Sequence, residues 1–279
     1  AINMTKGMTI HRMFNSDYAQ NFAFKEYNTL KDIDLLIIDE VGLVDMTQLV
    51  KVFSAIQYGC KILMFGDSNQ IKQLPVNTLD FLNKNVKQLQ LSVNYRIKEN
   101  SLHGIFKQFS ETGELPSDNH EILEKNKLVK KAIELYNNGY LILTNTLQIA
   151  KVLNNELSLD KDPLYNGEYK FSVGDPIIST INNYSFQIMN GQMFKIIKKS
   201  SDSFIIESSD DEKRRFKIPF SYFHKQYFAL AHALTIAKFQ GSQAEKVAVI
   251  FEDHNNTERK KREVRYVQNK NLTYTGITR

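Results

Sequence analysis

The stretch Leu35-Leu36-Ile37-Ile38-Asp39-Glu40 decides the fold, because four apolar residues run directly into two carboxylates. A short continuous apolar run is typical of a strand buried on both faces, as in a parallel sheet. Two acids at its end would be costly in a core unless they were paired or bound to a metal. Ligands gather beyond the carboxyl ends of strands in open α/β sheets, so we expect Asp39 and Glu40 in a catalytic crevice. An acidic strand-to-loop junction is the alternative.

A second stretch repeats this pattern about one βαβ unit later. Residues 61–67 form an apolar run that ends in Gly66-Asp67, and the chain continues as Ser68-Asn69-Gln70-Ile71-Lys72-Gln73-Leu74-Pro75. Between the two runs, residues 46–57 have apolar side chains at helical spacing, and Gly59 is a plausible helix stop. The order predicts two parallel strands joined by a crossover helix.

Together the two stretches resemble motifs II and III of superfamily 1 helicases, which are a Walker B strand with Asp-Glu and then Gly-Asp-x-x-Gln-x-x-x-Leu-Pro. The resemblance implies that Asp39 binds Mg²⁺, that Glu40 orients the attacking water, and that Gln70 senses the γ-phosphate of ATP. It also implies that Gly66 and Asp67 lie beside the nucleotide. ATP and Mg²⁺ are therefore the expected cofactors.

Two arginines lie in later motifs of the same family. Asn94-Tyr95-Arg96 resembles motif IV, and the stretch from Leu272 to Arg279 resembles motif VI. The resemblance implies that Arg96 and Arg279 stabilise charge in phosphoryl transfer from the second lobe. A lone arginine after a strand is more often a surface salt-bridge partner, but the order of the motifs favours the functional interpretation.

The stretch from Leu230 to Gln243 resembles motif V of the RecD/Dda-like group. Thr235, Lys238, Gln240 and Gly241 match the family pattern, whereas Ala237 stands where histidine is usual. The resemblance implies DNA contacts at Thr235, Lys238 and Gln240 and an ATP contact at Gly241. It implies no role for Ala237.

Other polar residues are implied to contact single-stranded DNA. Thr9-Ile10-His11 resembles a segment near the DNA track, with Thr9 and His11 as the contacts. Two further segments resemble the signature of an SH3-like β-barrel inserted in RecD-like helicases, with Asn182, Tyr184 and Asn190 as the contacts. A polar loop and an ordinary Asn-Gly hairpin turn are the alternatives.

The resemblance covers the whole chain and implies an α/β fold of two RecA-like P-loop NTPase lobes with parallel sheets. We expect the first lobe at 1–93, with a short 1B insertion at about 15–34 whose aromatic residues could stack on a base. The second lobe is expected at 94–170 and 226–279. Five short alternating strands, at 171–175, 177–180, 193–198, 204–207 and 215–218, are separated by turn formers and predict a β-insertion at 171–225. The resemblance implies that this insertion is the SH3-like 2B element. Further strands are expected at 88–91, 140–145 and 246–251, and helices at 101–113 and from 146 through 157.

Composition excludes several classes of protein. Apolar residues make up 42% and charged residues 24%, with a net charge of +5 and one cysteine, Cys60. The chain has no run long enough for a membrane span, no cluster of Cys and His for a metal, and no possible intramolecular disulfide. We expect a cytoplasmic protein of bacterial, plasmid or phage context.

A Walker A loop, Gly-x-x-x-x-Gly-Lys-Thr/Ser, is not found, because none of the twelve glycines precedes a lysine. We therefore expect a fragment of a longer helicase whose loop lies before Ala1. The expected activity is ATP-dependent translocation on single-stranded DNA, 5′→3′ by resemblance, with unwinding at duplex junctions in replication, recombination or repair. The expected partners are single-stranded DNA, duplex junctions and replication or recombination proteins. The alternatives are a nucleic-acid-binding module that no longer hydrolyses ATP, a structural or regulatory paralogue that docks onto a replication or repair complex, and an RNA helicase.

Overall fold

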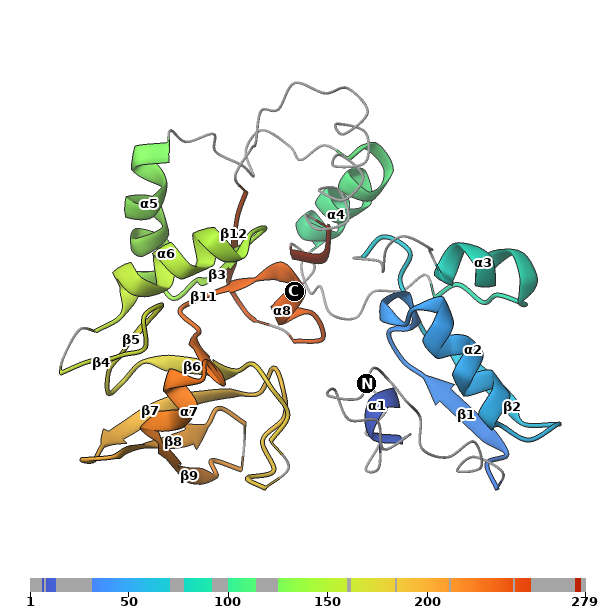
Figure 1. The fold of residues 1–279 in the computed structure, drawn as a ribbon. Coiled ribbons are helices and arrows are strands. Elements are labelled where there is room, and N and C mark those ends of the chain that lie inside the picture. The colour runs from blue at the N-terminus through green and yellow to red at the C-terminus, as the bar shows by residue number, and fades with distance from the viewer. Residues whose placement is uncertain are drawn as a thin grey trace. The chain divides into compact units, whose positions relative to one another are not determined.

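The computed structural model describes residues 7, 9–13, 32–70, 78–91, 100–113, 125–159, 162–183, 185–210, 212–242, 244–251 and 274–276 (Figure 1). The chain divides into two compact units, residues 1–96 and 97–279. Each unit is described by itself. The predicted boundaries of the lobes and of the insertion remain predictions.

The first unit contains a parallel pair of strands joined by a helix. Strands β1 and β2 run in register, with Leu35 opposite Lys61 and Ile38 opposite Met64. The elements of this unit are α1 (Ile10–Met13), β1 (Leu35–Ile38), the 3-10 helix η2 (Val41–Leu43), α2 (Met46–Ala55), β2 (Lys61–Met64) and α3 (Thr78–Asn85). The parallel pair and the crossover helix are as predicted.

Helix α2 begins with a capping box and buries one face. The Asp45 carboxylate accepts from the Gln48 backbone N–H at 2.7 Å, and the Gln48 side chain accepts from the Asp45 N–H at 3.4 Å. The buried residues are Leu49, Val52 and Ala55, which lie three apart and pack on Leu36 and Ile38. This arrangement fixes the loop between β1 and α2, where the two predicted catalytic acids lie.

Strand β1 departs from the prediction of burial on both faces. Leu36 and Ile38 are buried, Ile37 is half-buried, and Leu35 is 52% exposed. The predicted strand at 88–91 is wrong, since these residues are irregular and Leu89 and Leu91 are 89% and 85% exposed. Among the strands that the structure describes, none pairs with this segment.

The second unit contains a three-stranded parallel sheet in the order β11-β3-β12. Helices α5 and α6 pack on it around Ala132, Ile142 and Leu153. The elements of this part are α4 (Asn100–Thr112), α5 (Lys125–Asn137), β3 (Leu141–Thr144), α6 (Leu147–Leu157), β11 (Ala233–Thr235), α8 (Ile236–Phe239) and β12 (Val247–Ile250). The predicted strands at 140–145 and 246–251 are thereby confirmed with shorter bounds. The predicted helices are also confirmed, and the one expected at 101–113 begins and ends one residue earlier.

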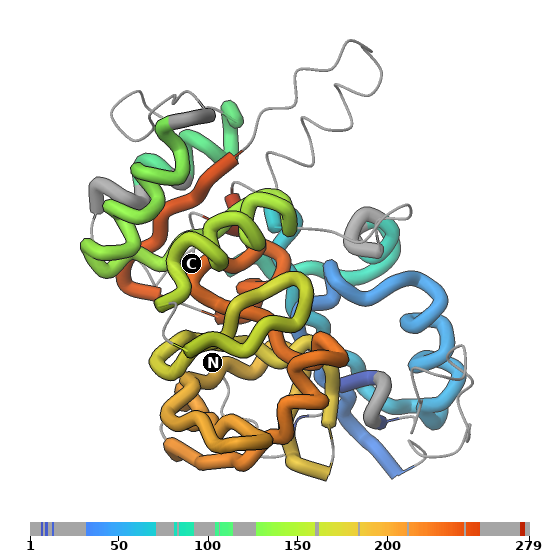
Figure 2. The backbone as a smooth tube through the Cα atoms, turned by 60° about the vertical axis from the view of Figure 1, so that its left-hand side comes forward, coloured from blue at the N-terminus to red at the C-terminus, as the bar shows by residue number. Residues whose placement is uncertain are grey.

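Between α6 and β11 the chain forms the β-insertion, defined as residues 162–230, which runs from yellow to orange in Figure 2. It is built on an antiparallel five-stranded sheet in the order β10-β6-β7-β8-β9. A β-bulge interrupts the pairing of β7 with β8 between Ile196 and Lys198. The elements are β4 (Leu164–Tyr165), β5 (Lys170–Phe171), β6 (Pro176–Ser179), β7 (Met193–Lys199), β8 (Ser203–Ser208), β9 (Arg215–Pro219), α7 (Phe220–His224) and β10 (Phe228–Leu230). The predicted strand at 171–175 is largely a turn. The pairing of β10 with β6 shows that this sheet extends past residue 225.

An aromatic core holds the β-insertion together. Phe223 lies at its centre, with ring centroids 5.1 Å from Phe171, 5.0 Å from Phe204 and 5.0 Å from Phe228. Phe171, Phe204 and Phe223 are fully buried. Large rings fill the space because short strands supply few side chains each. Among the residues that the structure describes, no helix is long and apolar enough to cross a membrane.

Candidate functional site

The carboxyl ends of β1 and β2 lie side by side in the first unit. The Phe65 N–H donates to the Ile38 carbonyl at 2.8 Å, and the Val41 N–H donates to the Phe65 carbonyl at 2.9 Å. These two bonds extend the parallel pairing beyond the strands. They bring Asp39 and Glu40 to the same sheet edge as Gly66 and Asp67, which is where a parallel sheet binds ligands.

Glu40 occupies a backbone conformation that is unusual for its residue type. Its φ of 51° and ψ of 43° lie in the left-handed region, and it forms the N-cap of η2. Its N–H donates to Asp39 Oδ1 at 2.9 Å. Left-handed backbone at a residue with a side chain costs about 1 kcal/mol or more and is concentrated at functional sites. The turn places two consecutive acids, one exposed and one half-buried, directly after the strand.

The second acidic loop is organised by Asp67. One carboxylate oxygen accepts from the Asn69 N–H at 2.9 Å, and the other accepts from the Gln70 side chain at 3.1 Å. The Gln70 N–H also donates to the Asp67 carbonyl at 3.2 Å. The structure thus joins two residues of the predicted motif III, Asp67 and Gln70, and holds the amide of Gln70 at the sheet edge.

Asp39 is chemically suited to Mg²⁺. Its side chain is exposed and offers carboxylate oxygens, the donors that this cation prefers. The described residues contain no cluster of three or more Asp, Glu, His or Cys that could hold a metal ion. A single carboxylate is nevertheless enough for Mg²⁺ in nucleotide sites, because substrate phosphates and water complete the coordination.

Three of the predicted DNA-binding residues meet in the second unit. The Lys238 ammonium, from α8, donates to the side-chain oxygen of Asn190, from the β-insertion. The Asn190 N–H in turn donates to the Asn182 side-chain oxygen at 2.9 Å. Burial lowers the pKa of Lys238 below its ordinary value. This polar cluster, Asn182–Asn190–Lys238, joins residues 56 positions apart in sequence, from Asn182 to Lys238.

Thr235 caps the short helix that carries Lys238. Its hydroxyl accepts from the Lys238 N–H at 3.2 Å, which fixes the backbone from which the lysine side chain extends. Gln240 ends this helix, and Gly241 follows with φ of 87°. The motif V residues therefore form one compact turn after β11, and Ala237 is exposed on it.

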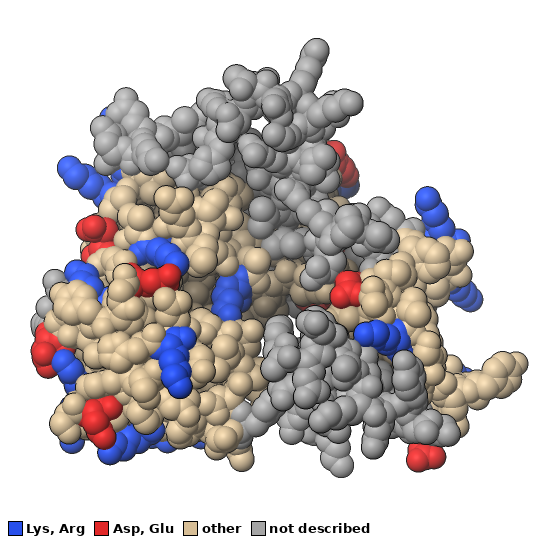
Figure 3. All heavy atoms as spheres, in the orientation of Figure 1, with Lys and Arg blue, Asp and Glu red and all other residues tan. Residues whose placement is uncertain are grey.

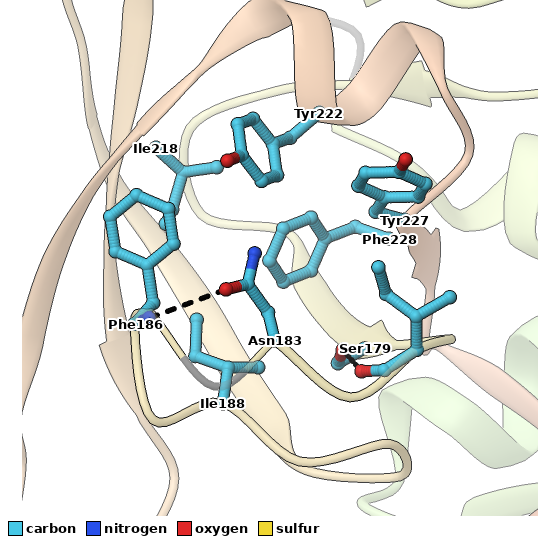
Figure 4. A pocket seen from close by; sticks show the side chains of 9 residues that line it. Ser179, Asn183, Phe186, Ile188, Ile218, Tyr222, Tyr227 and Phe228 are labelled. Carbon is cyan, nitrogen blue, oxygen red and sulfur yellow. Dashed lines mark hydrogen bonds between the residues drawn. The ribbon is translucent and has the colours of Figure 1, made fainter. Parts of the chain in front are cut away.

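The loop that bears Asn182 and Asn190 lines a shallow apolar indentation (Figure 4). Phe186 packs edge-to-face on Tyr222 at 5.6 Å, and the Phe186 N–H donates to the Asn183 side chain at 3.3 Å. Tyr222 packs similarly on Tyr227 at 5.5 Å. The loop is thus packed on α7, which carries Tyr222, and on the segment before β10, which carries Tyr227.

Charge does not distinguish this region. On the face shown in Figure 3, basic and acidic side chains of the β-insertion are interspersed. Several are paired, including Arg215 with Glu207 at 2.8 Å and Lys199 with Asp162 at 2.9 Å. The case for the polar cluster as a DNA site therefore depends on its geometry and not on a basic patch.

Other predicted residues are placed in part or lie outside the described residues. Arg96, Arg279 and Tyr184 are among the latter, as is the side chain of His11. Thr9 precedes α1, and its carbonyl accepts from the Met13 N–H at 3.0 Å. Residues 274–276, just before Arg279, are helical, and Gly276 lies so close to β12 that an added Cβ would be 3.1 Å from Val249 Cγ2.

A buried polar group in the second unit was not predicted from the sequence. Asp175, His232 and Tyr136 are hydrogen-bonded to one another although they lie far apart in sequence. No pattern of neighbouring residues in the sequence predicts such a contact. A histidine at the end of a buried strand, within a motif, was the one available signal.

Comparisons with known proteins agree with the motifs. A family model for AAA domains matches residues 2–75. The RecBCD enzyme subunit RecD of Buchnera aphidicola subsp. Acyrthosiphon pisum is 25% identical over 97% of this chain and 56% of that protein. RecD of Buchnera aphidicola subsp. Schizaphis graminum is 33% identical over 26% of this chain and 12% of that protein. The chain thus spans little more than half the length of the first of these relatives and matches a smaller part of the second.

Solved structures show the same fold at low sequence identity. Bacteroides Pif1 bound to single-stranded DNA superposes with a TM-score of 0.61 at 14% identity, over 98% of this chain and 76% of that one. The same helicase with ADP-AlF3 and single-stranded DNA gives 0.61 at 16% identity, with the same coverage of both chains. The predicted α/β architecture with parallel sheets is confirmed, while the SH3-like barrel stays a prediction. These matches confirm the resemblance to the RecD- and Pif1-like helicases of superfamily 1.

Proposed function

We propose that this chain forms most of the motor core of an ATP-dependent DNA helicase that moves along single-stranded DNA. One observation carries the proposal: the parallel pairing of β1 with β2 brings Asp39, Glu40, Asp67 and Gln70 to one sheet edge in the order of motifs II and III. The similarity to RecD over nearly the whole chain supports it. We further propose movement 5′→3′ and a role in DNA replication, recombination or repair in the cytoplasm.

The proposed chemistry divides between two neighbouring acids. Asp39 would hold Mg²⁺, which supplies charge neutralisation on the phosphates when bound. Glu40 would orient the attacking water, and the left-handed turn at Glu40 keeps its carboxylate off the path of the strand. Gln70, held by Asp67, would respond to the γ-phosphate. Arg96 and Arg279 would stabilise the charge of the transferring group.

The polar cluster Asn182–Asn190–Lys238 is the proposed contact with the DNA backbone. An ammonium and two amides suit a phosphodiester, because they can donate to its oxygens without reading the base. Thr235 and Gln240 flank this cluster on the motif V turn. In this proposal residues 171–225 act as an SH3-like insertion that helps clamp the strand, and the two lobes keep the predicted boundaries. Nothing in these residues discriminates the 2′-hydroxyl of RNA.

The test is the substitution Glu40→Gln in the full gene product that contains this chain. The amide keeps the size of the side chain but cannot act as a base, so DNA-stimulated ATP turnover should fall by about a hundredfold or more. Binding of a fluorescent ATP analogue should be retained. Asp34→Asn is the matched control, because Asp34 is an exposed acid at the opposite end of β1. Turnover like the wild type in Glu40→Gln would refute the assignment.

A second candidate function depends on the polar cluster Asn182–Asn190–Lys238 alone, because these groups can bind a phosphodiester without a nucleotide. A module that binds single strands without hydrolysing ATP would retain the polar cluster and ignore nucleotide. If the full gene product binds single-stranded DNA equally well with and without ATP, and shows no turnover, this second function replaces the first.

A further inference from the structure

Two connections link the β-insertion to the parallel-sheet part of the second unit. The outgoing connection leaves α6 at Ser158 and Leu159. The return connection runs from β10 to β11 through Ala231 and His232 alone. Two residues of connection cannot by themselves fix the orientation of one sheet on another, because each has two soft backbone angles. Additional contacts must set this orientation.

Asp175 receives hydrogen bonds from both connections. Its Oδ1 accepts from the Leu159 N–H at 3.2 Å and from His232 Nε2 at 3.2 Å. Its Oδ2 accepts from the Ser172 N–H at 2.8 Å and lies 2.9 Å from the Ser158 hydroxyl, which is equally close to the Lys170 carbonyl. Asp175 itself belongs to the turn before β6. One carboxylate therefore joins the outgoing chain, the returning chain and the β-insertion.

The chemistry of these groups determines where the protons lie. A carboxylate that accepts several hydrogen bonds is ionised, so His232 Nε2 carries a proton and donates. The other ring nitrogen of His232, Nδ1, lies 2.7 Å from the Tyr136 hydroxyl. A chain of hydrogen bonds therefore runs from Tyr136 on α5, through His232, to Asp175. We call the group Asp175–His232–Tyr136 the joint, because its hydrogen bonds connect the β-insertion to α5 in the parallel-sheet part.

This joint is buried and tightly packed. Asp175 is 0% exposed and His232 is 2% exposed, so water cannot replace a lost partner. Gly174, beside Asp175, has φ of 101°, and a Cβ there would lie 2.6 Å from Leu159 Cδ1. The Asn154 side chain also holds the return connection through two hydrogen bonds of 2.9 Å to the Ala233 backbone. Neighbouring backbone is thus fixed on both sides of the carboxylate.

The joint precedes the polar cluster along both chain segments that contribute to the cluster. Lys238 follows His232 by six residues, through β11 and the Thr235 cap. Asn190 lies in the β-insertion that Asp175 holds. The Lys238–Asn190 hydrogen bond lies at the surface, although the Lys238 side chain is half-buried. A single hydrogen bond of this kind contributes too little to orient two sheets. It forms because other contacts have already placed the two residues.

We infer that Asp175 is a positioning residue, which acts through His232 and Tyr136 to hold the β-insertion so that Asn190 meets Lys238. The inference rests on the proposed role of this cluster in DNA binding. Asp175 itself touches neither DNA nor nucleotide. Its loss would leave each part folded but would let the insertion turn against the parallel sheet, so that the two halves of the cluster separate.

The first experiment measures binding of an oligothymidylate to the full gene product and to variants with four substitutions, alone and in combination. Asp175→Asn should weaken binding by about three- to tenfold, with DNA-independent ATP turnover unchanged. In this background Asn190→Ala should have no further effect. Ile206→Val, a control in the buried core of the insertion, should leave the full effect of Asn190→Ala. Tyr136→Phe keeps the ring and removes the outermost hydrogen bond, so it serves if Asp175→Asn does not fold.

Two results would overturn the inference. Asp175→Asn could lower the melting temperature without changing DNA affinity, which is a merely structural role. Asn190→Ala could also keep its full effect in the Asp175→Asn and Tyr136→Phe backgrounds, which would mean that the joint does not place Asn190.

A second readout needs neither ATP nor DNA. Asn190→Cys and Lys238→Cys are combined with Cys60→Ser, and a short bifunctional maleimide links the two new thiols. Linking should be rapid with Asp175 in place and several-fold slower with Asp175→Asn. If the protein neither binds DNA nor hydrolyses ATP, the proposed function fails while this result still tests the joint. Equal linking rates would overturn the inference.

Discussion

At the scale of single residues, Glu40 shows a conflict between the local backbone and the side chain it carries. Its left-handed conformation is one that glycine adopts freely. A glutamate is retained there at a cost of about 1 kcal/mol. Such a cost is understandable if the carboxylate is needed at this point. The proposed role of Glu40 as the water-orienting residue provides that need.

Glu40→Gly and Glu40→Val separate stability from activity at this residue. Glycine relieves the left-handed conformation but has more freedom when unfolded, so the free energy of unfolding should stay within about 1 kcal/mol of the wild type. Valine is β-branched and should lose about 1–2 kcal/mol. Both variants should lose ATP turnover. Urea unfolding and a turnover assay measure the two quantities, and a glycine variant less stable than the valine variant would contradict the argument.

Asp175 should make the stability of the second unit depend on pH. Burial raises the pKa of this carboxyl, but hydrogen bonds from His232, Ser172, Leu159 and Ser158 outweigh burial and lower the pKa below its ordinary value of 3.8. The ionised form is therefore favoured by folding. Its contribution is present above pH 3.8 and is lost as the pH falls through the lowered pKa.

Comparison with Asp175→Asn gives the measurement. The variant should unfold at lower urea concentration than the wild type at neutral pH, because an amide cannot accept as many hydrogen bonds as a carboxylate. This difference in urea midpoint should narrow as the pH falls below 3.8, because Asp175 is protonated there, first in the unfolded chain and at lower pH in the folded protein. A difference in urea midpoint that stays constant over this pH range would show that the charge of Asp175 does not contribute to stability.

At the scale of elements, the aromatic core decides whether the β-insertion forms. Its strands have two to seven residues and depend on Phe223, which touches three other rings. Phe223→Ala should cost about 3–5 kcal/mol of unfolding free energy, since the cavity is surrounded by rigid rings. Tyr165→Ala, in the 60% exposed position of β4, should cost less than about 0.5 kcal/mol. Urea midpoints compare the two, and equal losses would contradict this account of the core.

Elements with a continuous apolar run or helical spacing were predictable from the sequence. The strands β1, β2, β3 and β12 and the helices α2, α4 and α6 were found in this way. The strand expected at 88–91 failed, because two leucines among glutamines fit a strand but pair with none of the strands that the structure describes. Pairing is a property of the whole sheet and is absent from a four-residue window.

The candidate sites were predictable where one short segment carries them. Asp39-Glu40 and Asp67 with Gln70 each lie within four residues, and sheet topology then joins the two pairs. Asp175 and His232 lie 57 residues apart and have ordinary neighbours, so their contact needs the folded structure. The bond between Asn190 and Lys238 was also hidden, although resemblance had assigned both residues to DNA binding separately.

At the scale of the whole molecule, the net charge of +5 is compatible with a polyanionic partner. Affinity for single-stranded DNA should fall with salt, and each phosphate neutralised by a lysine adds about 0.7 to the slope of log K against log salt. Lys238→Ala should therefore lower both affinity and slope, the slope by about 0.7. Asn190→Ala should lower affinity and leave the slope unchanged.

A titration at several salt concentrations distinguishes the two variants. An unchanged slope in Lys238→Ala would mean that this ammonium does not meet a phosphate, even if affinity falls. A lowered slope in Asn190→Ala would mean that the lysine depends on its amide partner for its position. Either result would place the polar cluster more sharply than affinity alone.

The two-residue return from β10 to β11 also bears on how such proteins can be recombined. A module joined by long flexible linkers can be exchanged as a unit between related proteins. Here the exchange would fail unless the donor also brought its own counterpart of the Asp175–His232 pair, because the splice points lie inside one buried hydrogen-bond network. A chimaera should therefore keep residues 158–175 and 231–233 from one parent and vary the sequence between them.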